Sequence, residues 1–168
     1  NVDFGDLDLS ANDQFTLWHT WFYDVFSQGG FDIVIANPPY VQLSKQPDVD
    51  RNYIQILKQE FGTSGGRANL FIFMLHQAIN LSNEKGIISY IIPNTILTQE
   101  YYSDTRMLIQ QYNLRQIVNY NDMEFANAVV ENVTLIMSKE TIEDYNVNIY
   151  DCKGKEIYLS KSVSVKKF

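Results

Sequence analysis

The tetrapeptide Asn37-Pro38-Pro39-Tyr40 directly follows the apolar run Phe31–Ala36 and could bind a planar amine. Each proline fixes φ at about −65° and removes an N–H donor, so the segment is stiff and its carbonyls stay free to accept hydrogen bonds. The side-chain oxygen of Asn37 and the carbonyl of Pro38 could accept the two hydrogens of one exocyclic amine. Such contacts favour a pyramidal amine whose lone pair can attack an electrophile. The Tyr40 ring offers a face on which a base could stack.

The apolar run before the tetrapeptide predicts a buried parallel strand. It is short and rich in β-branched residues, and it lies between Gly29-Gly30 and the prolines. Parallel strands of α/β proteins open into ligand crevices at their carboxyl ends. The simpler interpretation is an ordinary turn, since Asn and Pro are frequent in turns. The position directly after a strand favours a binding site.

The composition predicts one α/β domain with a hydrophobic core. The chain has 168 residues, of which 45% are hydrophobic and 14% aromatic, which argues against disorder. A single cysteine, Cys152, excludes a disulfide framework. With only His19 and His76 available, a structural zinc site is not expected, and no other metal is. The sequence has neither a signal pattern nor a long apolar run, so we expect a cytoplasmic protein that makes no membrane contact.

The net charge of −7 is the wrong sign for a protein that holds DNA by its phosphates. The acidic and basic residues are unevenly distributed. Residues 1–36 carry six aspartates and no lysine or arginine, whereas residues 151–168 carry five lysines against two acidic residues. An acidic catalytic core remains compatible with DNA if a separate recognition domain supplies the basic surface.

Hydrophobic periodicity alternates along the chain between helical and strand patterns, which predicts an α/β sheet. The expected helices cover residues 13–27, 50–61, 68–81 and 102–112, and the expected strands cover residues 31–36, 87–92, 114–120 and 129–138. We expect the aromatic stripe of the first helix to lie in the core. Too few residues separate the last two strands for a helical crossover, so the last strand is expected to be antiparallel and at one sheet edge.

An apolar strand followed by Asn-Pro-Pro-Tyr resembles the signature of amino-methyltransferases that use S-adenosylmethionine (SAM). Three classes share it: adenine-N6 DNA methyltransferases, some RNA guanine-N2 methyltransferases and release-factor glutamine methyltransferases. The later landmarks resemble those of the adenine-N6 enzymes of restriction-modification systems whose cofactor motif comes first and recognition domain last. These landmarks are Gly66-Arg67-Ala68-Asn69-Leu70-Phe71 opening a helix, the strand that ends in Ile92-Pro93-Asn94, the strand from Leu114, and Phe125 ahead of the strand from Asn132.

This resemblance implies a partial Rossmann-like methyltransferase sheet that is mostly parallel with an antiparallel edge strand. The implied reaction transfers a methyl group from SAM to an adenine flipped out of DNA, because N6 cannot be reached within the stacked duplex. In such a site Asn37, Pro38, Pro39 and Tyr40 would be catalytic, Tyr40 and Phe125 would pack the base from opposite faces, Asp6, Asn69 and Phe71 would contact the cofactor, and Arg67 would meet a DNA phosphate.

The glycine loop that holds SAM in this family does not occur, because the chain contains no Gly-x-Gly. We therefore expect residues 1–145 to be the C-terminal catalytic half of a methyltransferase domain and residues 146–168 to begin a linker or recognition region. Such a fragment is expected to be inactive alone and to form oligomers through an exposed sheet edge, with DNA as the partner of the full-length protein. A release-factor glutamine methyltransferase, an RNA guanine-N2 methyltransferase and a non-catalytic α/β interaction module remain alternatives.

Overall fold

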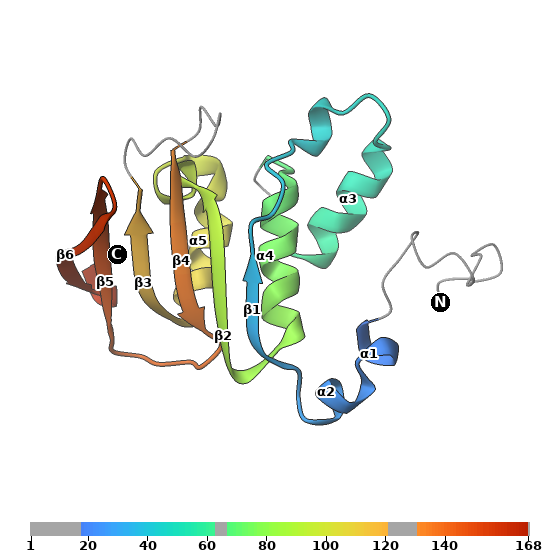
Figure 1. Cartoon of the computed structure of the whole chain (residues 1–168). Coiled ribbons are helices and arrows are strands. Elements are labelled where there is room, and N and C mark those ends of the chain that lie inside the picture. The colour runs from blue at the N-terminus through green and yellow to red at the C-terminus, as the bar shows by residue number, and fades with distance from the viewer. Residues whose placement is uncertain (1–17, 63–66, 121–130, 168) are drawn as a thin grey trace.

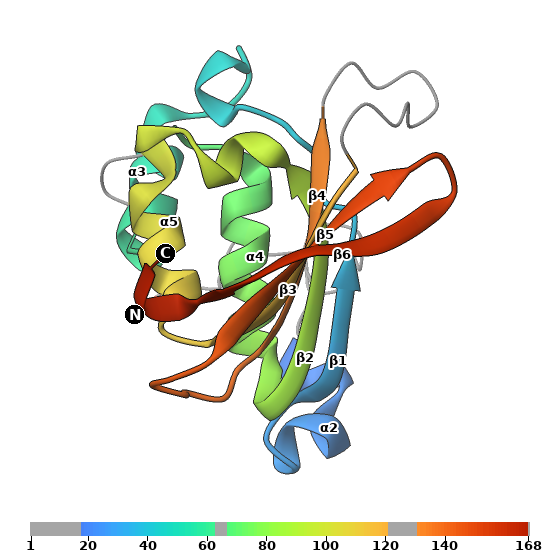
Figure 2. The ribbon, with the colours of Figure 1, turned by 90° about the vertical axis from the view of Figure 1, so that its left-hand side faces the viewer.

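A six-stranded sheet with helices packed on one face forms the framework of the chain (Figure 1). The computed structural model describes residues 18–62, 67–120 and 131–167. The strands lie in the order β1-β2-β4-β3-β5-β6, and Figure 2 shows α3, α4 and α5 together on one side of them. The strands are β1 (Phe31–Ala36), β2 (Ser82–Pro93), β3 (Asn113–Asn119), β4 (Asn132–Ser138), β5 (Asn146–Lys153) and β6 (Glu156–Ser164).

The strand directions confirm the expected mixed sheet with an antiparallel edge strand. Strands β1, β2, β3 and β5 run in one direction, whereas β4 and the edge strand β6 run in the other. The expected position of β4 at an edge is wrong, because β4 lies between β2 and β3. The crossover from β2 to β3 through α5 leaves a gap one strand wide, and β4 returns into it. Residues 146–164, expected to begin a linker, form β5 and β6 of the sheet.

Helix α4 (Leu70–Leu81) is the central helix, and most of its residues are buried. Its Phe71, Leu75 and Ile79 pack in the cluster that faces the sheet. Its Phe73 belongs to a second cluster with Ile54 of α3 (Arg51–Glu60). Helix α4 is therefore held between the sheet and α3. These two helices confirm the helices predicted over residues 50–61 and 68–81. Helix α5 spans Ser103–Gln110, and short 3-10 turns span Leu43–Lys45, Asn94–Leu97, Glu100–Tyr102 and Val165–Lys167.

The expected helix over residues 13–27 is different in the part that the structure describes. Two short helices, α1 (Trp18–Trp21) and α2 (Tyr23–Ser27), replace it, and neither contains a buried residue. The rings of Phe22 and Phe26 meet Phe31 at centroid distances of 5.3 and 5.5 Å. The aromatic stripe thus packs on one residue at the start of an edge strand, which offers too little surface to bury it.

Close backbone contact fixes the register of β1 against β2 at their amino ends. A Cβ on Gly30, whose φ is +120°, would lie 2.6 Å from the carbonyl oxygen of Leu81. A Cβ on Gly86 would lie 2.9 Å from the carbonyl oxygen of Phe31. Neither position can carry a side chain without moving the backbone. The parallel pairing then runs to its last pair, Ala36 with Tyr90.

Strand β1 is parallel as predicted, but it is buried on one face only. Val34 and Ala36 pack against the core, whereas Ile33 and Ile35 are 61% and 74% exposed. Among the described residues, β1 pairs only with β2, and no helix covers its outer face. The sheet therefore presents an apolar face and an open edge on the same strand.

His76 of α4 is buried and forms a T-shaped ring contact with Phe61, at a centroid distance of 5.8 Å. Its Nε2 is buried and has no hydrogen-bond partner within the described part of the chain. Burial disfavours the charged form and lowers the pKa of His76 to about 4. The side chain is therefore neutral in the folded protein at neutral pH.

Acidification should destabilise the protein through His76. Its folded-state pKa lies below the ordinary value of 6.5, so the unfolded chain takes up the proton first. The free energy of unfolding should fall by roughly 2–3 kcal/mol between about pH 6.5 and pH 4. Urea titrations across this range should show that His76→Met removes this loss, whereas replacement of the exposed His19 by Gln retains it. An unchanged pH dependence in His76→Met would contradict this assignment.

Candidate functional site

The carboxyl ends of β1, β2 and β3 meet at one edge of the sheet, because these strands run in the same direction. The tetrapeptide follows β1 at this edge. Residues 41–43, which come next, form backbone hydrogen bonds with the residues around the start of α4. The N–H of Leu70 donates to the carbonyl of Val41 at 2.8 Å, and the N–H of Leu43 donates to that of Ala68 at 2.8 Å. The tetrapeptide is thereby held between a strand end and a helix start.

Within the tetrapeptide, Asn37 and Pro39 are exposed, Pro38 is buried and Tyr40 is half-buried. The Tyr40 hydroxyl lies 3.1 Å from the carbonyl oxygen of Ile91 in β2 and 3.2 Å from Oδ1 of Asn37. Burial raises the pKa of Tyr40, so the hydroxyl stays protonated at neutral pH. The structure thus places the Asn37 amide at the surface and ties Tyr40 to the neighbouring strand.

A row of aromatic rings extends from the tetrapeptide to Arg67. Tyr40 meets Phe71 edge-on at 6.1 Å, and Phe71 meets Tyr102 at 5.5 Å. Tyr102 contacts Tyr101 at 4.6 Å, and the guanidinium carbon of Arg67 lies 4.5 Å from the Tyr101 ring centroid. This aromatic row, formed by Tyr40, Phe71, Tyr102 and Tyr101, links the start of α4 to the segment that follows β2. A cation over a ring of this kind is held by the ring quadrupole.

Tyr102 is the buried centre of the aromatic row. Burial, and next the neighbouring Tyr101, raise the pKa of Tyr102 to about 12, against the opposite effects of Arg67 and of a hydrogen bond with Asn69. Tyr102 is therefore neutral and serves to fix its neighbours.

Asn69 immediately precedes α4 and has an oxygen without a partner. Its Oδ1 is buried and accepts no hydrogen bond from the described residues. An orphaned buried acceptor is costly unless a ligand or water donates to it, so Asn69 fits a contact to a polar ligand. Phe71 is fully buried and packs edge-on against the rings of Tyr40 and Tyr102, so it fixes the position of the Tyr40 ring.

Two of the predicted site residues, Asp6 and Phe125, lie outside the described residues. The topology does place the residues on either side of the segment that holds Phe125. Tyr120 follows β3 at the edge where β1 and β2 end, and Glu131 accepts a hydrogen bond from the N–H of Asn94 at 2.9 Å.

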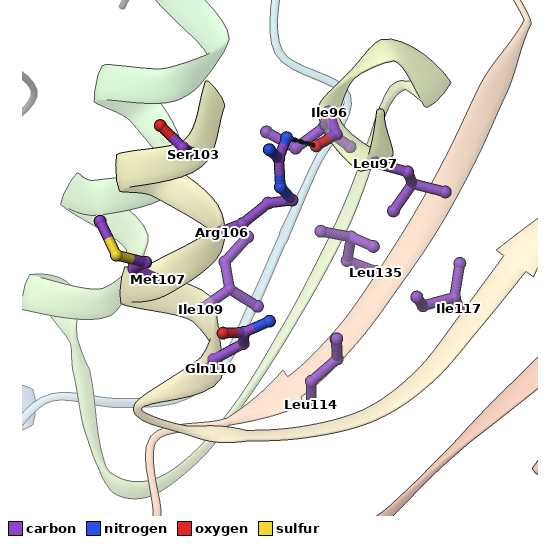
Figure 3. Close-up of a pocket in the computed structure, with 10 residues that line it drawn as sticks. All are labelled: Ile96, Leu97, Ser103, Arg106, Met107, Ile109, Gln110, Leu114, Ile117 and Leu135. Carbon is purple, nitrogen blue, oxygen red and sulfur yellow. Dashed lines mark hydrogen bonds between the residues drawn. The ribbon is translucent and has the colours of Figure 1, made fainter. Parts of the chain in front are cut away.

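A separate hollow of about 320 Å³ lies between α5 and the sheet (Figure 3). Its lining is mainly apolar and includes Ile117 and Leu135. Arg106 points into it and donates to the carbonyls of Ile96 and Gln99 at 2.9 and 2.7 Å. The Arg106 guanidinium therefore stabilises the turns that precede α5. None of the predicted site residues that the structure describes lines this hollow.

Two partners of the site do not follow from the sequence. Tyr101 and the carbonyl of Ile91 belong to segments far along the chain from the tetrapeptide, and only the parallel pairing of β1 with β2 brings them near. The available signal is the pair Tyr101-Tyr102 shortly after the second strand, because the carboxyl ends of parallel strands share one edge. Among the described residues there is no group of three or more His, Cys, Asp or Glu that could hold a metal ion. Nor is any of their helices both long and apolar enough to cross a membrane.

The sequence matches the family described as Eco57I restriction-modification methylase over residues 1–125. It is also 34% identical over 100 residues to the modification methylase CviBIII of Paramecium bursaria Chlorella virus NC1A. That match covers 59% of this chain and 22% of the relative. The chain thus spans about a fifth of the length of this curated relative.

Solved structures share the fold at low sequence identity. A class I SAM-dependent methyltransferase from Listeria monocytogenes matches with a TM-score of 0.56 and 15% identity, over 73% of this chain and 37% of that one. The M protein of the type I restriction enzyme EcoKI matches with a TM-score of 0.54 and 19% identity, over 76% of this chain and 26% of that one. The α/β sheet is therefore part of a class I methyltransferase fold, as the resemblance predicted.

Proposed function

The chain belongs to the Eco57I restriction-modification methylase family, and from this premise we propose that it carries the catalytic half of a site-specific adenine-N6 DNA methyltransferase. The family is one of SAM-dependent methyltransferases of restriction-modification systems. The proposed substrate is an adenine flipped out of DNA in the full-length protein. In this proposal, residues 1–145 are the catalytic half of the domain, and β5 and β6 lead towards the recognition region.

The single observation that supports this reaction is the placement of Asn37 and Pro38 at the end of β1. Asn37 is exposed and Pro38 is rigid, so the two residues hold their acceptor oxygens close together at a fixed edge of the sheet. Two acceptors on one amine weaken its conjugation with the ring and direct its lone pair. Acceptors that are in position before the chemical step stabilise the transition state without having to reorient during that step.

SAM, when bound, supplies an electrophilic methyl group. The residues of this chain proposed to hold it are Asn69, through its orphaned Oδ1, and Asp6. Phe71, expected from the resemblance to contact the cofactor, is fully buried, so we propose instead that it supports the aromatic row. Tyr40 is proposed to stack on one face of the adenine and Phe125 on the other. Because the glycine loop for SAM is missing from the sequence, we propose that the chain alone is inactive.

Methylation assays on the full-length protein should show transfer to adenine that depends on Asn37. With labelled SAM and DNA, Asn37→Ala should lower kcat by about 10²–10³, because it removes one acceptor of the transition state. Asn80→Ala, which replaces an exposed asparagine of α4, is the matched control and should retain activity. The isolated 168-residue chain should incorporate no label.

The molecule that receives the labelled methyl group distinguishes the proposed function from its alternatives. Label found in adenine supports the proposed function, and label found in a release-factor glutamine or in guanine of RNA would replace it with one of the alternative methyltransferases. No transfer to any of these would favour the non-catalytic interaction module.

Arg67 is the proposed DNA contact of the chain. Its side chain is exposed and its guanidinium lies over the Tyr101 ring, at the end of the aromatic row that begins at Tyr40, which supports a contact with DNA that enters the site. Arg67→Ala should weaken DNA binding by the full-length protein about fivefold and lower the salt slope by about one. Lys85→Ala removes an exposed cation near the amino end of β2, at the other end of the strands from the tetrapeptide. It should leave the DNA affinity and the salt slope unchanged. An equal effect of the two substitutions would contradict a specific contact.

The open edge of β1 is proposed to drive association of the isolated chain. Ile33 and Ile35 are exposed on a strand that, among the residues the structure describes, pairs with β2 alone. Ile35→Lys should shift the isolated chain to monomer in sedimentation velocity, because a charge on an edge strand opposes pairing. Ile157→Lys, on the opposite edge strand β6, is the control and should leave association unchanged. Loss of association in the control alone would assign the interface to β6.

A further inference from the structure

The Tyr40 hydroxyl has two acceptors within reach but only one hydrogen. It lies 3.1 Å from the carbonyl oxygen of Ile91 and 3.2 Å from Oδ1 of Asn37. A hydroxyl donates one hydrogen and accepts with its lone pairs, so it cannot serve both oxygens fully. The same Oδ1 is the atom that the proposed function assigns to the target amine. The hydrogen bond between Tyr40 and Oδ1 of Asn37 therefore has to change when the amine binds.

The register of the sheet shows that the Ile91 carbonyl needs this hydrogen. Lys139 donates to the Gly86 carbonyl and Asn94 donates to that of Glu131, so the even-numbered residues of β2 bond towards β4. The odd-numbered residues, including Ile91, consequently bond towards β1. Continued past its last pair, Ala36 with Tyr90, the register would set Asn37 opposite Ile91.

Pro38 is the reason why this carbonyl lacks a backbone donor. In a parallel ladder the Ile91 carbonyl would accept from the N–H one residue beyond Asn37. That residue is Pro38, which has no N–H. The Tyr40 hydroxyl reaches the carbonyl instead, so its single hydrogen satisfies a sheet acceptor that the proline leaves without a partner.

We propose that Tyr40 is a positioning residue that orients the Asn37 amide for the target amine. With the amine bound, the amide makes a half-turn about its Cβ–Cγ bond, so that Nδ2 donates to Tyr40 Oη and Tyr40 Oη donates to the Ile91 carbonyl. The oxygen of Asn37 then faces away from Tyr40 and accepts from the amine. This inference rests on the proposed function. No backbone atom has to move, because the half-turn only exchanges the two ends of the amide.

A double-mutant cycle in the full-length protein tests the coupling between the two side chains. Tyr40→Phe keeps the ring and removes the hydroxyl, so it should lower kcat about tenfold with the KM for DNA unchanged. Asn37→Asp presents an oxygen in either orientation and needs no partner to orient it. In the Asn37→Asp background, Tyr40→Phe should therefore change kcat less than twofold. Fluorescence of a 2-aminopurine at the target position should be the same before and after Tyr40→Phe, because base stacking is retained.

Tyr90→Phe is the matched control for loss of a tyrosine hydroxyl. Tyr90 belongs to the same strand as Ile91, and its hydroxyl donates to the carbonyl of Met74 at 3.1 Å on the helix side of the sheet. This substitution should leave kcat within twofold. An equal loss from Tyr40→Phe in the wild-type and the Asn37→Asp backgrounds, or a loss confined to KM, would overturn the orienting role.

A second measurement separates this inference from the proposed function. In protein labelled with ¹⁵N at asparagine, addition of target DNA should shift one side-chain amide proton of Asn37 downfield, and Tyr40→Phe should abolish the shift. This readout needs no turnover. A shift in a protein that methylates another amine supports the orienting role while the adenine proposal fails. Absence of the shift in a protein that methylates adenine overturns the orienting role alone.

Discussion

The parallel pairing of β1 with β2 is the constraint on which the site depends. At the amino ends of the two strands, Gly30 and Gly86 allow a backbone approach that any side chain would block. At the carboxyl ends, the pairing stops at Ala36 and Tyr90 because Pro38 cannot donate to the next carbonyl. The residues that end the strand are thus also the residues proposed to bind the amine. The chemistry of the site begins where the sheet hydrogen bonds cease.

Helix α4 transmits this constraint to the other side of the site. It is buried against the sheet on one side and against α3 on the other, so its first turn has little freedom to move. Asn69 precedes that turn, and Phe71 within it supports both Tyr40 and Tyr102. The packing of Phe71 in the core therefore fixes the position of the aromatic row. Arg67 is held at the far end of the row by Tyr101, which is why an exposed cation can have a defined place.

Local patterns in the sequence identify the elements that carry the site, but not their neighbours. The strand before Asn37 and the helices α3 and α4 all follow from hydrophobic periodicity. The insertion of β4 between β2 and β3 does not, because periodicity does not say which strand lies next to which. The contact of Tyr40 with Ile91 joins residues 51 positions apart, so only the sheet register reveals it.

The open edge of β1 and the amine site belong to one short segment. Ile33 and Ile35 are bare on the outer face of the strand, and Asn37 follows within the same extended stretch. A strand that paired with this edge would run beside β1 and end near Asn37, since neighbouring strands lie about 5 Å apart. Any strand that paired there would therefore lie within reach of the proposed amine acceptors, the oxygens of Asn37 and Pro38.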